Sequence, residues 1–291
     1  MQKDNKLECS VVTKWIEIEL TNYCWMNCLV CPRKKLKNFG FMEIDIFKKV
    51  VVFLSKWNYS EIVFSGLGDA FLHKDLFKIV DYLYSYFPNA TFFLMTKWQW
   101  INKAHLEKIL EYKQKWFNIS LTFSIFSLNR ILFNYLTWWD FYDKFMQVLL
   151  WAHKIWLDYS LEFLVSPLTL REIDKFVKFA NKLWKDYGFS LVHNWAGSIN
   201  NKIYSKLFDE KKLKNFYQIR KQDDICEVMK YDYVFINYLG DIYQCSLNYS
   251  RWLWKLWNVF TNNLKDVLLK KKSLDYNKLC KGCFYFKYKT F

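Results

Sequence analysis

The sequence predicts an α/β fold in which parallel strands and helices form a fragment of a barrel. Three observations support this fold. Between residues 15 and 194, strand-like segments alternate six times with segments whose apolar residues recur at helical spacing. Consecutive strand–helix–strand units favour a parallel sheet with right-handed connections. A cysteine-rich loop directly follows the first predicted strand, at the strand end where such barrels carry their active sites.

The first strand is predicted over residues 15–20, where Ile16, Ile18 and Leu20 share one face. A helix near 43–55 follows the cysteine loop. The next segments continue the alternation in this order: strand 61–65, helix 76–87, strand 91–95, helix 102–113, strand 118–125, helix 141–152 and strand 157–165.

Pro167 interrupts this pattern, and Thr169 with Glu172 predicts a capping box at the start of another helix. The buried face of that helix is predicted to contain Ile173, Phe176, Val177, Ala180 and Leu183. A sixth strand over 189–194 completes the six units, and the Lys-, Asp- and Asn-rich stretch that follows is interpreted as a helical linker.

The composition fits a protein with one large domain and a small appendage. Its 291 residues are 53% apolar, which is enough for a core. No apolar run approaches the roughly 18 residues of a membrane helix. The first residues also lack an export signal, so we expect a cytoplasmic protein with no membrane partner.

The net charge is +15, but only five of the 43 basic residues are Arg. Because Arg is preferred for phosphate contacts, we interpret the excess as solvated surface and do not expect nucleic acid to bind; an anionic partner is the alternative.

Eight cysteines in a chain without an export signal favour metal or redox chemistry over disulfides. Cys24, Cys28 and Cys31 form a CxxxCxxC array. Three thiolates on one loop hold three irons of a [4Fe–4S] cube, and the fourth iron is left open for a substrate or cofactor.

Cys9 is interpreted as a partly buried free thiol. The four histidines lack metal-binding spacing and are interpreted as surface or hydrogen-bonded residues: His73, His105, His153 and His193.

The CxxxCxxC array after a first barrel strand resembles the cluster loop of the radical SAM superfamily. The resemblance implies that the open iron binds the amino and carboxylate groups of S-adenosylmethionine (SAM). It also implies that one electron cleaves the sulfonium and that a 5′-deoxyadenosyl radical abstracts hydrogen from the substrate. One departure is Val30, which stands where the family usually carries an aromatic residue near the adenine.

A second motif lies just past the second predicted strand. There, Gly68 and Asp69 take the places that resemble the family's "GGEP" segment, which binds the SAM ammonium, although Ala70 replaces the proline. A carboxylate suits a cationic amine. By the same analogy, Thr96 and Ser124 at the ends of the third and fourth strands contact the SAM amino acid or ribose, with ordinary turn or strand hydroxyls as the alternative.

The C-terminal cysteines form a second ligand set: Cys226, Cys245, Cys280 and Cys283. Four thiolates complete an S4 site, which fits either structural zinc or an iron–sulfur cluster. The spacing of Cys226, Gly240 and Cys245 resembles the opening of a SPASM motif, with a hairpin around Leu239 and Gly240. SPASM domains use seven cysteines, so four resemble the truncated "twitch" version. The resemblance implies a second, auxiliary [4Fe–4S] cluster that relays electrons or shapes the substrate pocket.

Together, these features predict an α/β chain with a partial (β/α)6 radical SAM barrel over residues 12–200. A linker over 201–222 leads to a small C-terminal β-hairpin/helix Fe–S domain over 223–291, of the twitch type.

Tryptophan is abundant where glycine is expected. The chain has 15 Trp and seven Gly. Together they make 22 of the 291 residues, a share close to the roughly 7% that glycine averages in globular proteins. Trp25, Trp98 and Trp257 occupy predicted turn positions, where a residue tolerant of positive φ is needed. Relatives carry glycine at the positions that resemble Trp98 and Trp257. Because some bacterial lineages read UGA as glycine, we hypothesise that many of these residues are natively glycine; a truly Trp-rich core is the alternative.

The function that this resemblance implies is a radical SAM enzyme acting on a peptide or small molecule, by oxidation or cross-linking. A reductant such as flavodoxin or ferredoxin would supply the electron, and no residue identifies itself as the general base. The rival hypothesis is a zinc-stapled basic protein that binds nucleic acid and performs no SAM chemistry. It predicts bound zinc and salt-dependent nucleic-acid affinity.

Overall fold

The structure is a computed structural model that describes residues 15–55, 59–192, 233–249 and 255–275. Within these ranges, nine strands form one sheet in the order β6-β5-β4-β3-β2-β1-β7-β8-β9. The strands are β1 (Trp15–Ile18), β2 (Glu61–Phe64), β3 (Thr91–Thr96), β4 (Ile119–Ile125), β5 (Tyr159–Val165), β6 (Tyr187–Leu191), β7 (Phe235–Ile236), β8 (Asp241–Tyr243) and β9 (Lys255–Asn258). The first six strands are parallel to their neighbours, as predicted.

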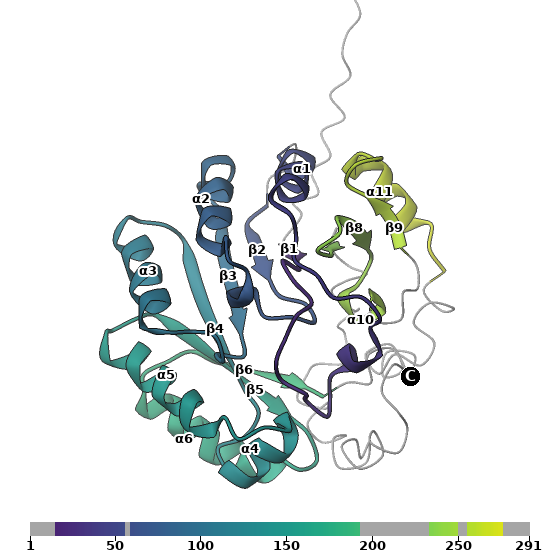
Figure 1. Cartoon of the computed structure of the whole chain (residues 1–291). Helices are drawn as coiled ribbons and strands as arrows, with labels where there is room; N and C mark the ends of the chain where they lie inside the picture. The colour runs from purple at the N-terminus through teal and green to yellow at the C-terminus, as the bar shows by residue number, and fades with distance from the viewer. Residues whose placement is uncertain (1–14, 56–58, 193–232, 250–254, 276–291) are drawn as a thin grey trace, which may run out of the picture.

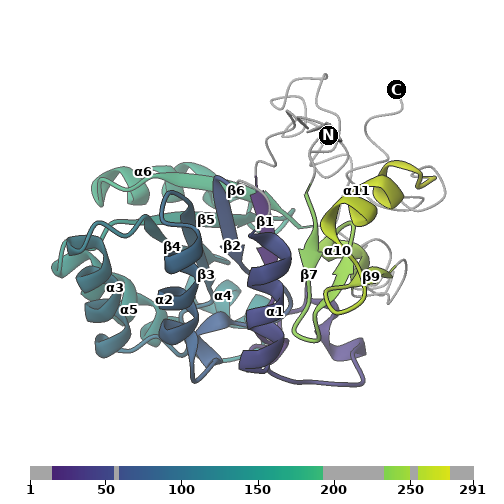
Figure 2. The same ribbon diagram turned by 90° about the horizontal axis from the view of Figure 1, so that it is seen from above.

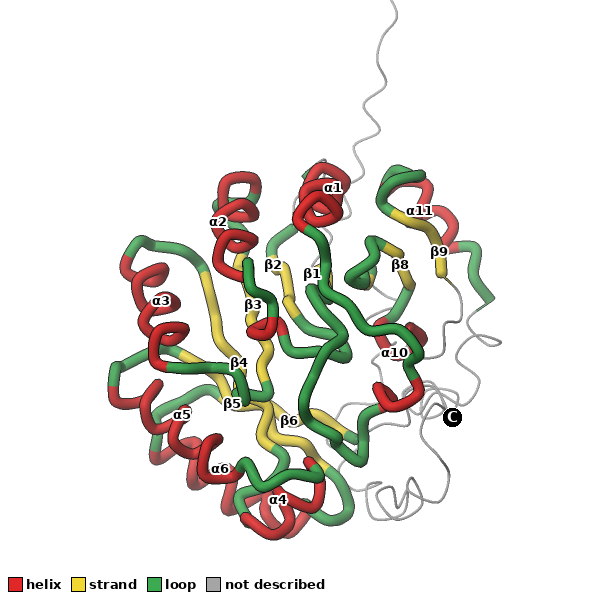
Figure 3. Tube along the Cα trace, in the orientation of Figure 1, coloured by secondary structure: helices red, strands yellow, loops and turns green. Residues whose placement is uncertain are grey.

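Most helices follow the strands in chain order and cover the outer face of the curved sheet (Figures 1 and 3). The short helix at Ser246–Tyr249 instead packs through Tyr249 against Phe235 and Tyr243. The α-helices are α1 (Ile44–Leu54), α2 (Leu76–Tyr86), α3 (Lys103–Gln114), α4 (Arg130–Thr137), α5 (Tyr142–Lys154), α6 (Ile173–Lys182), α10 (Ser246–Tyr249) and α11 (Leu264–Lys272). Short 3₁₀ turns lie at η1 (Pro32–Lys35), η2 (Ala70–Leu72) and η3 (Leu170–Glu172). Among the residues that the structure places, no helix is long and apolar enough to cross a lipid bilayer.

The two faces of the sheet differ in polarity. Residues such as Ile16, Phe92 and Leu121 point outward and are fully buried against the helices. This burial removes apolar surface from water and so stabilises the barrel. Alternate positions point inward, where Ser124 and Glu162 remain partly exposed. Residues of this inward face line a cavity. In the described chain the sheet is open, with β6 and β9 as its two edges.

The predicted strands lie close to the observed ones, with shifts at the ends. The fifth strand begins at Tyr159, two residues later than predicted, and β6 begins at Tyr187, two residues earlier. Residues 193 and 194, at the end of the predicted sixth strand, lie outside the described residues. The predicted linker over 201–222 also lies outside them.

The predicted capping box of Thr169 and Glu172 is wrong. The Thr169 side chain makes no helix-cap bond; its hydroxyl donates to the Leu164 carbonyl at 2.9 Å and accepts from Ser166 N at 2.8 Å. Glu172 instead reaches the turn after β4, where it accepts hydrogen bonds from Ser127 and Leu128. A tertiary contact therefore takes the carboxylate that a local cap would have used.

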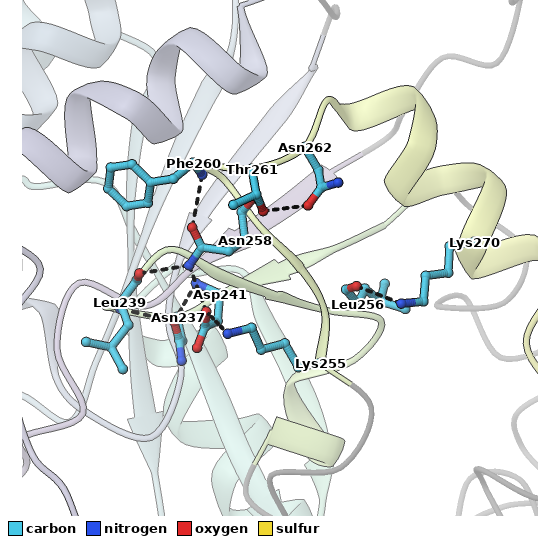
Figure 4. Close-up of polar contacts among 10 residues, drawn as sticks. All are labelled: Asn237, Leu239, Asp241, Lys255, Leu256, Asn258, Phe260, Thr261, Asn262 and Lys270. Atoms are coloured by element: carbon cyan, nitrogen blue, oxygen red, sulfur yellow. Dashed lines mark hydrogen bonds and ion pairs between the residues drawn. The ribbon is translucent and has the colours of Figure 1, made fainter.

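The C-terminal hairpin is confirmed. Strands β7 and β8 pair in antiparallel fashion around Leu239 and Gly240, and Gly240 adopts φ +76°. In addition, β7 pairs in parallel with β1, so the C-terminal strands continue the barrel sheet (Figure 2). Figure 4 shows how β9 is tied to the hairpin: the Asn258 amide donates to Asp241 at 2.7 Å. The domain boundaries at 200 and 223 remain a prediction.

Tryptophans occupy the left-handed positions of this backbone. The described non-glycine residues with positive φ are Trp98, Trp116, Trp138, Trp156 and Trp184. The turn predicted at Trp98 is therefore present. Trp25 lies at a bend of the cysteine loop, as predicted, but without a positive φ. Trp257 lies in β9 rather than in a turn and also has no positive φ.

Candidate active site at the cysteine loop

The three cysteines of the CxxxCxxC array lie on one long loop after β1 and line a single cavity. The opposite wall comes from the inner faces of β4, β5 and β6 and includes Ser124, Glu162 and Ser190. The structure thus brings Cys24, Cys28 and Cys31 of the loop and Ser124 of β4 to one cavity, although these two segments are distant in sequence. Val30 is buried and also lines the cavity.

Helix α4 fixes the cysteine loop, although the sequence analysis did not predict this helix. The Leu29 amide donates to the Leu136 carbonyl at 2.9 Å, and the Asn27 amide donates to the Thr137 carbonyl at 3.3 Å. The last carbonyls of a helix have no partner within the helix. The loop supplies those partners, so the cysteines are held at a defined place over the open end of the barrel.

The other end of the loop is fixed by Asn22. Its side-chain oxygen accepts from the Gly40 amide, and its side-chain nitrogen donates to the Asn38 carbonyl, each at 2.9 Å. His73 supports the same segment by bonding to the Met42 carbonyl through Nε2 at 2.8 Å. His73 is therefore a hydrogen-bonded histidine, in agreement with its interpretation from the sequence.

Gly68 and Asp69 pack directly against the cysteine loop. A Cβ atom on Gly68 would overlap the carbonyl oxygens of Thr21 and Tyr23, so this close approach needs glycine. The Asp69 amide then donates to the Tyr23 carbonyl at 3.0 Å. The motif after β2 and the loop after β1 consequently form one rigid unit.

The Asp69 carboxylate is buried and accepts three hydrogen bonds. One oxygen accepts from the Phe71 amide at 3.1 Å, and the other accepts from the Thr96 hydroxyl at 3.0 Å and the Lys97 amide at 2.8 Å. Burial raises the pKa of this carboxyl, and Lys97 opposes the shift. Asp69 thus joins β3 to the turn after β2. Contact of Gly68, Asp69, Thr96 or Ser124 with SAM remains a prediction.

The cysteine thiols are held in a weakly solvated environment. Burial raises the pKa of the Cys24 thiol to about 12 and also raises the pKa of Cys28 and Cys31. The positive charge of Lys97, which lines the same cavity, acts in the opposite direction on all three. Because metals bind thiolates, metal binding here must release protons.

The donor set fits an iron–sulfur cube. Three soft sulfur ligands on one loop face one cavity, as a cube with an open iron requires. In the part of the chain that the structure describes, no three Cys, His, Asp or Glu side chains are gathered closely enough to hold a single metal ion.

The inward carboxylates were missed by the sequence analysis. Glu17 and Glu19 alternate with apolar residues in the first strand, yet both are buried. Glu17 bonds to Ser65 and Tyr233, and Glu19 accepts from the Leu67 amide at 2.8 Å. Such acidic residues in a half-apolar strand indicate a polar barrel interior rather than a solvent-facing side.

Glu162 was also missed, and its environment explains its position. Ser190 donates a hydrogen bond to its carboxylate from the neighbouring strand. A Cβ atom on Gly188, its partner in the sheet, would overlap the same carboxylate. Glycine at this point therefore leaves room for the acid at the wall of the cavity.

Of the second cysteine set, the structure describes one member. Cys245 follows β8 and is partly exposed. Cys226, Cys280 and Cys283 lie outside the described residues, so their grouping with Cys245 remains a prediction.

Comparison with known families identifies the class of this protein. The radical SAM superfamily profile matches residues 18–180, which is more than half of the chain. The chain therefore belongs to the radical SAM superfamily, whose members bind a [4Fe–4S] cluster and SAM. Among curated protein sequences, none matches this chain.

Solved structures show the same fold at low sequence identity. SuiB from Streptococcus suis, bound to the precursor peptide SuiA, is similar with a TM-score of 0.68 and 14% identity over 96% of this chain and 71% of that chain. The structure of anSMEcpe with bound AdoMet is similar with a TM-score of 0.65 and 16% identity, over 92% of this chain and 88% of that chain. BtrN in complex with AdoMet and 2-DOIA is similar with a TM-score of 0.60 and 16% identity, over 93% of this chain and 92% of that chain.

Proposed function

We propose that Cys24, Cys28 and Cys31 hold the [4Fe–4S] cluster at which SAM is reductively cleaved. When bound, the cluster supplies the electron that releases a 5′-deoxyadenosyl radical. The observation that carries this proposal is the convergence of the three thiols on one cavity, which is fixed by α4 and by Asn22. The turn that contains Gly68 and Asp69 lies against the loop and is proposed to seat the SAM amino group.

The proposed substrate is a peptide, which loses a hydrogen atom to the radical. To become oxidised or cross-linked, it must then give up one further electron and a proton, and the auxiliary cluster proposed for the C-terminal cysteines would accept that electron. Two similar structures, SuiB with SuiA and anSMEcpe with a peptide, are peptide complexes, which supports this choice. A small molecule is the alternative, in line with the BtrN complex. The substrate would lie against the wall opposite the cysteines, where Glu162 offers an acceptor for an N–H or O–H group.

The C-terminal cysteines Cys226, Cys245, Cys280 and Cys283 are proposed to hold one auxiliary [4Fe–4S] cluster in a twitch domain over residues 223–291. In support, the described hairpin β7–β8 leads directly to Cys245. A low-potential reductant such as flavodoxin or ferredoxin in the cytoplasm would supply electrons. With four protein thiolates, this cluster is suited to electron relay rather than to SAM binding.

The experiment is anaerobic reconstitution with iron and sulfide, followed by iron counting and assay for 5′-deoxyadenosine with SAM and dithionite. We expect about four irons per cube and adenosyl product. Replacement of Cys24, Cys28 and Cys31 by Ala should abolish the product, whereas Cys9→Ala is the matched control and should retain it. Protein that holds only zinc, or that yields no adenosyl product, would contradict the proposal.

A further inference from the structure

The described non-glycine residues with a left-handed backbone are all of one type. In the described ranges, every non-glycine residue with positive φ is a tryptophan, with φ between 53° and 65° at residues 98, 116, 138, 156 and 184. Tryptophan makes up only 15 of the 291 residues. Chance does not place it at all five such positions. An L-residue in this region is strained by roughly 1–2 kcal/mol, whereas glycine is not.

Three of these residues end barrel helices in the same way. After α3, the Trp116 amide donates to the Lys113 carbonyl and the Phe117 amide donates to the Tyr112 carbonyl, both at 3.0 Å. These two bonds define a Schellman motif, in which the left-handed position is most often glycine.

Helices α5 and α6 repeat the arrangement. The Trp156 amide donates to the His153 carbonyl at 3.0 Å, and the next amide donates to Ala152. The Trp184 amide donates to the Asn181 carbonyl at 3.1 Å, again followed by the second bond of the motif. At the end of α4, Trp138 is the left-handed C-cap with φ 60° and ψ 27°. Four consecutive helices thus end on the same residue type in a glycine conformation.

The indoles at these helix ends do not compensate for the strain. The side chains of Trp116, Trp156 and Trp184 are 86%, 87% and 90% exposed. In addition, the buried indole N–H groups of Trp98, Trp151 and Trp257 have no hydrogen-bond partner, although the Trp98 ring packs against Phe133 and Phe145. A buried N–H of this kind normally finds an acceptor.

We infer that residues 98, 116, 138, 156 and 184 are glycine in the natural protein, encoded by UGA codons that the host reads as glycine. The assignment concerns the site directly at residue 98. There the backbone amide donates to the Thr96 hydroxyl at 2.7 Å, and that hydroxyl donates to Asp69. A left-handed residue 98 therefore closes the turn that supports Asp69, and glycine adopts it without strain.

The direct test is to read the codons at these five positions and to identify the corresponding peptides by mass spectrometry of the protein from its natural host. We expect UGA at each position and peptides that contain glycine. UGG codons, or peptides that contain tryptophan at these positions, would overturn the inference.

An independent test uses the helix ends in the full-length chain. Trp116, Trp156 and Trp184 are each replaced by Gly and, as the matched control, by Ala, which removes the indole but retains the strained backbone. We expect each Gly variant to unfold roughly 2–4 °C above its Ala counterpart, because glycine relieves the backbone strain at that one position. Ala variants that equal or exceed the Gly variants at all three positions would show that the backbone does not require glycine.

Discussion

At the scale of single residues, the pKa of the Glu19 carboxyl is strongly raised. This carboxyl is fully buried at the end of β1, and desolvation raises its pKa from 4.5 to about 8. The hydrogen bond from Leu67 acts in the opposite direction but is outweighed. A Cβ atom on Gly66 would collide with the Glu19 side chain, and Gly66 adopts φ +125°. The strand end is thus shaped around a carboxyl that the fold prefers in its neutral form.

This preference predicts a pH dependence of stability. The folded protein keeps the Glu19 proton up to about pH 8, whereas the unfolded chain releases it near pH 4.5. The contribution of Glu19 is therefore complete below pH 4.5 and is lost as the pH rises to about 8. Glu19→Gln mimics the neutral form and should flatten this decline in urea unfolding between pH 5 and pH 8. An unchanged slope in the variant would contradict the assignment.

Glu162 gives a second residue-level prediction. If it holds the substrate, Glu162→Gln should leave 5′-deoxyadenosine formation without peptide unchanged and should lower modification of a peptide substrate roughly tenfold or more, the cost of a hydrogen bond to a charged acceptor. Glu107→Gln, on the exposed surface of α3, is the control. Loss of SAM cleavage in the absence of peptide would instead place Glu162 at the SAM site.

At the scale of elements, the end of β4 is fixed by a neighbouring element. The turn from β4 to α4 is held by Glu172, which accepts from the Ser127 hydroxyl at 2.7 Å and the Leu128 amide at 2.9 Å. Helix α4 in turn holds the cysteine loop. The position of the cysteines therefore depends on a carboxylate at the start of α6.

Glu172→Ala should lower the free energy of unfolding by about 1–3 kcal/mol, because it leaves the Leu128 amide and the Ser127 hydroxyl without their acceptor. Asp174→Ala, in the exposed first turn of α6, is the control and should cost less. Denaturant unfolding measures both. Equal losses in the two variants would show that the contact across the turn adds no stability.

The same elements show how far the sequence predicts the fold. Apolar periodicity located β1 to β5 because their outer faces bury residues such as Phe92 and Leu121. Helix α4 was missed because it has only eight residues and ends at Trp138, where a glycine would have marked the stop. The role of Glu172 could not be predicted, since its partners lie 44 and 45 residues away. The cysteine loop was predicted from spacing alone, whereas Glu162 required the register with Gly188 and Ser190.

At the scale of the whole molecule, we expect cluster binding and folding to be coupled. The three thiols are protonated at neutral pH without metal, because burial raises their pKa. Iron bound to the folded loop and not to the unfolded chain adds stability by mass action. The reconstituted protein should therefore unfold at a higher temperature than the chelator-treated protein, as followed by circular dichroism. A variant with Ala at Cys24, Cys28 and Cys31 should show a smaller difference, because only the auxiliary cluster proposed at the C-terminal cysteines remains; an undiminished difference would contradict the coupling.

The parallel pairing of β7 with β1 has a consequence for truncation. The amides of Glu17 and Glu19 donate to the Val234 and Ile236 carbonyls, so the strand that leads into the cysteine loop is flanked on both sides. A fragment limited to residues 15–192, which keeps β1 to β6 and lacks β7, would leave that strand as a bare sheet edge. Unpaired edges recruit other chains, so such a fragment should self-associate through β1 rather than behave as an independent catalytic unit.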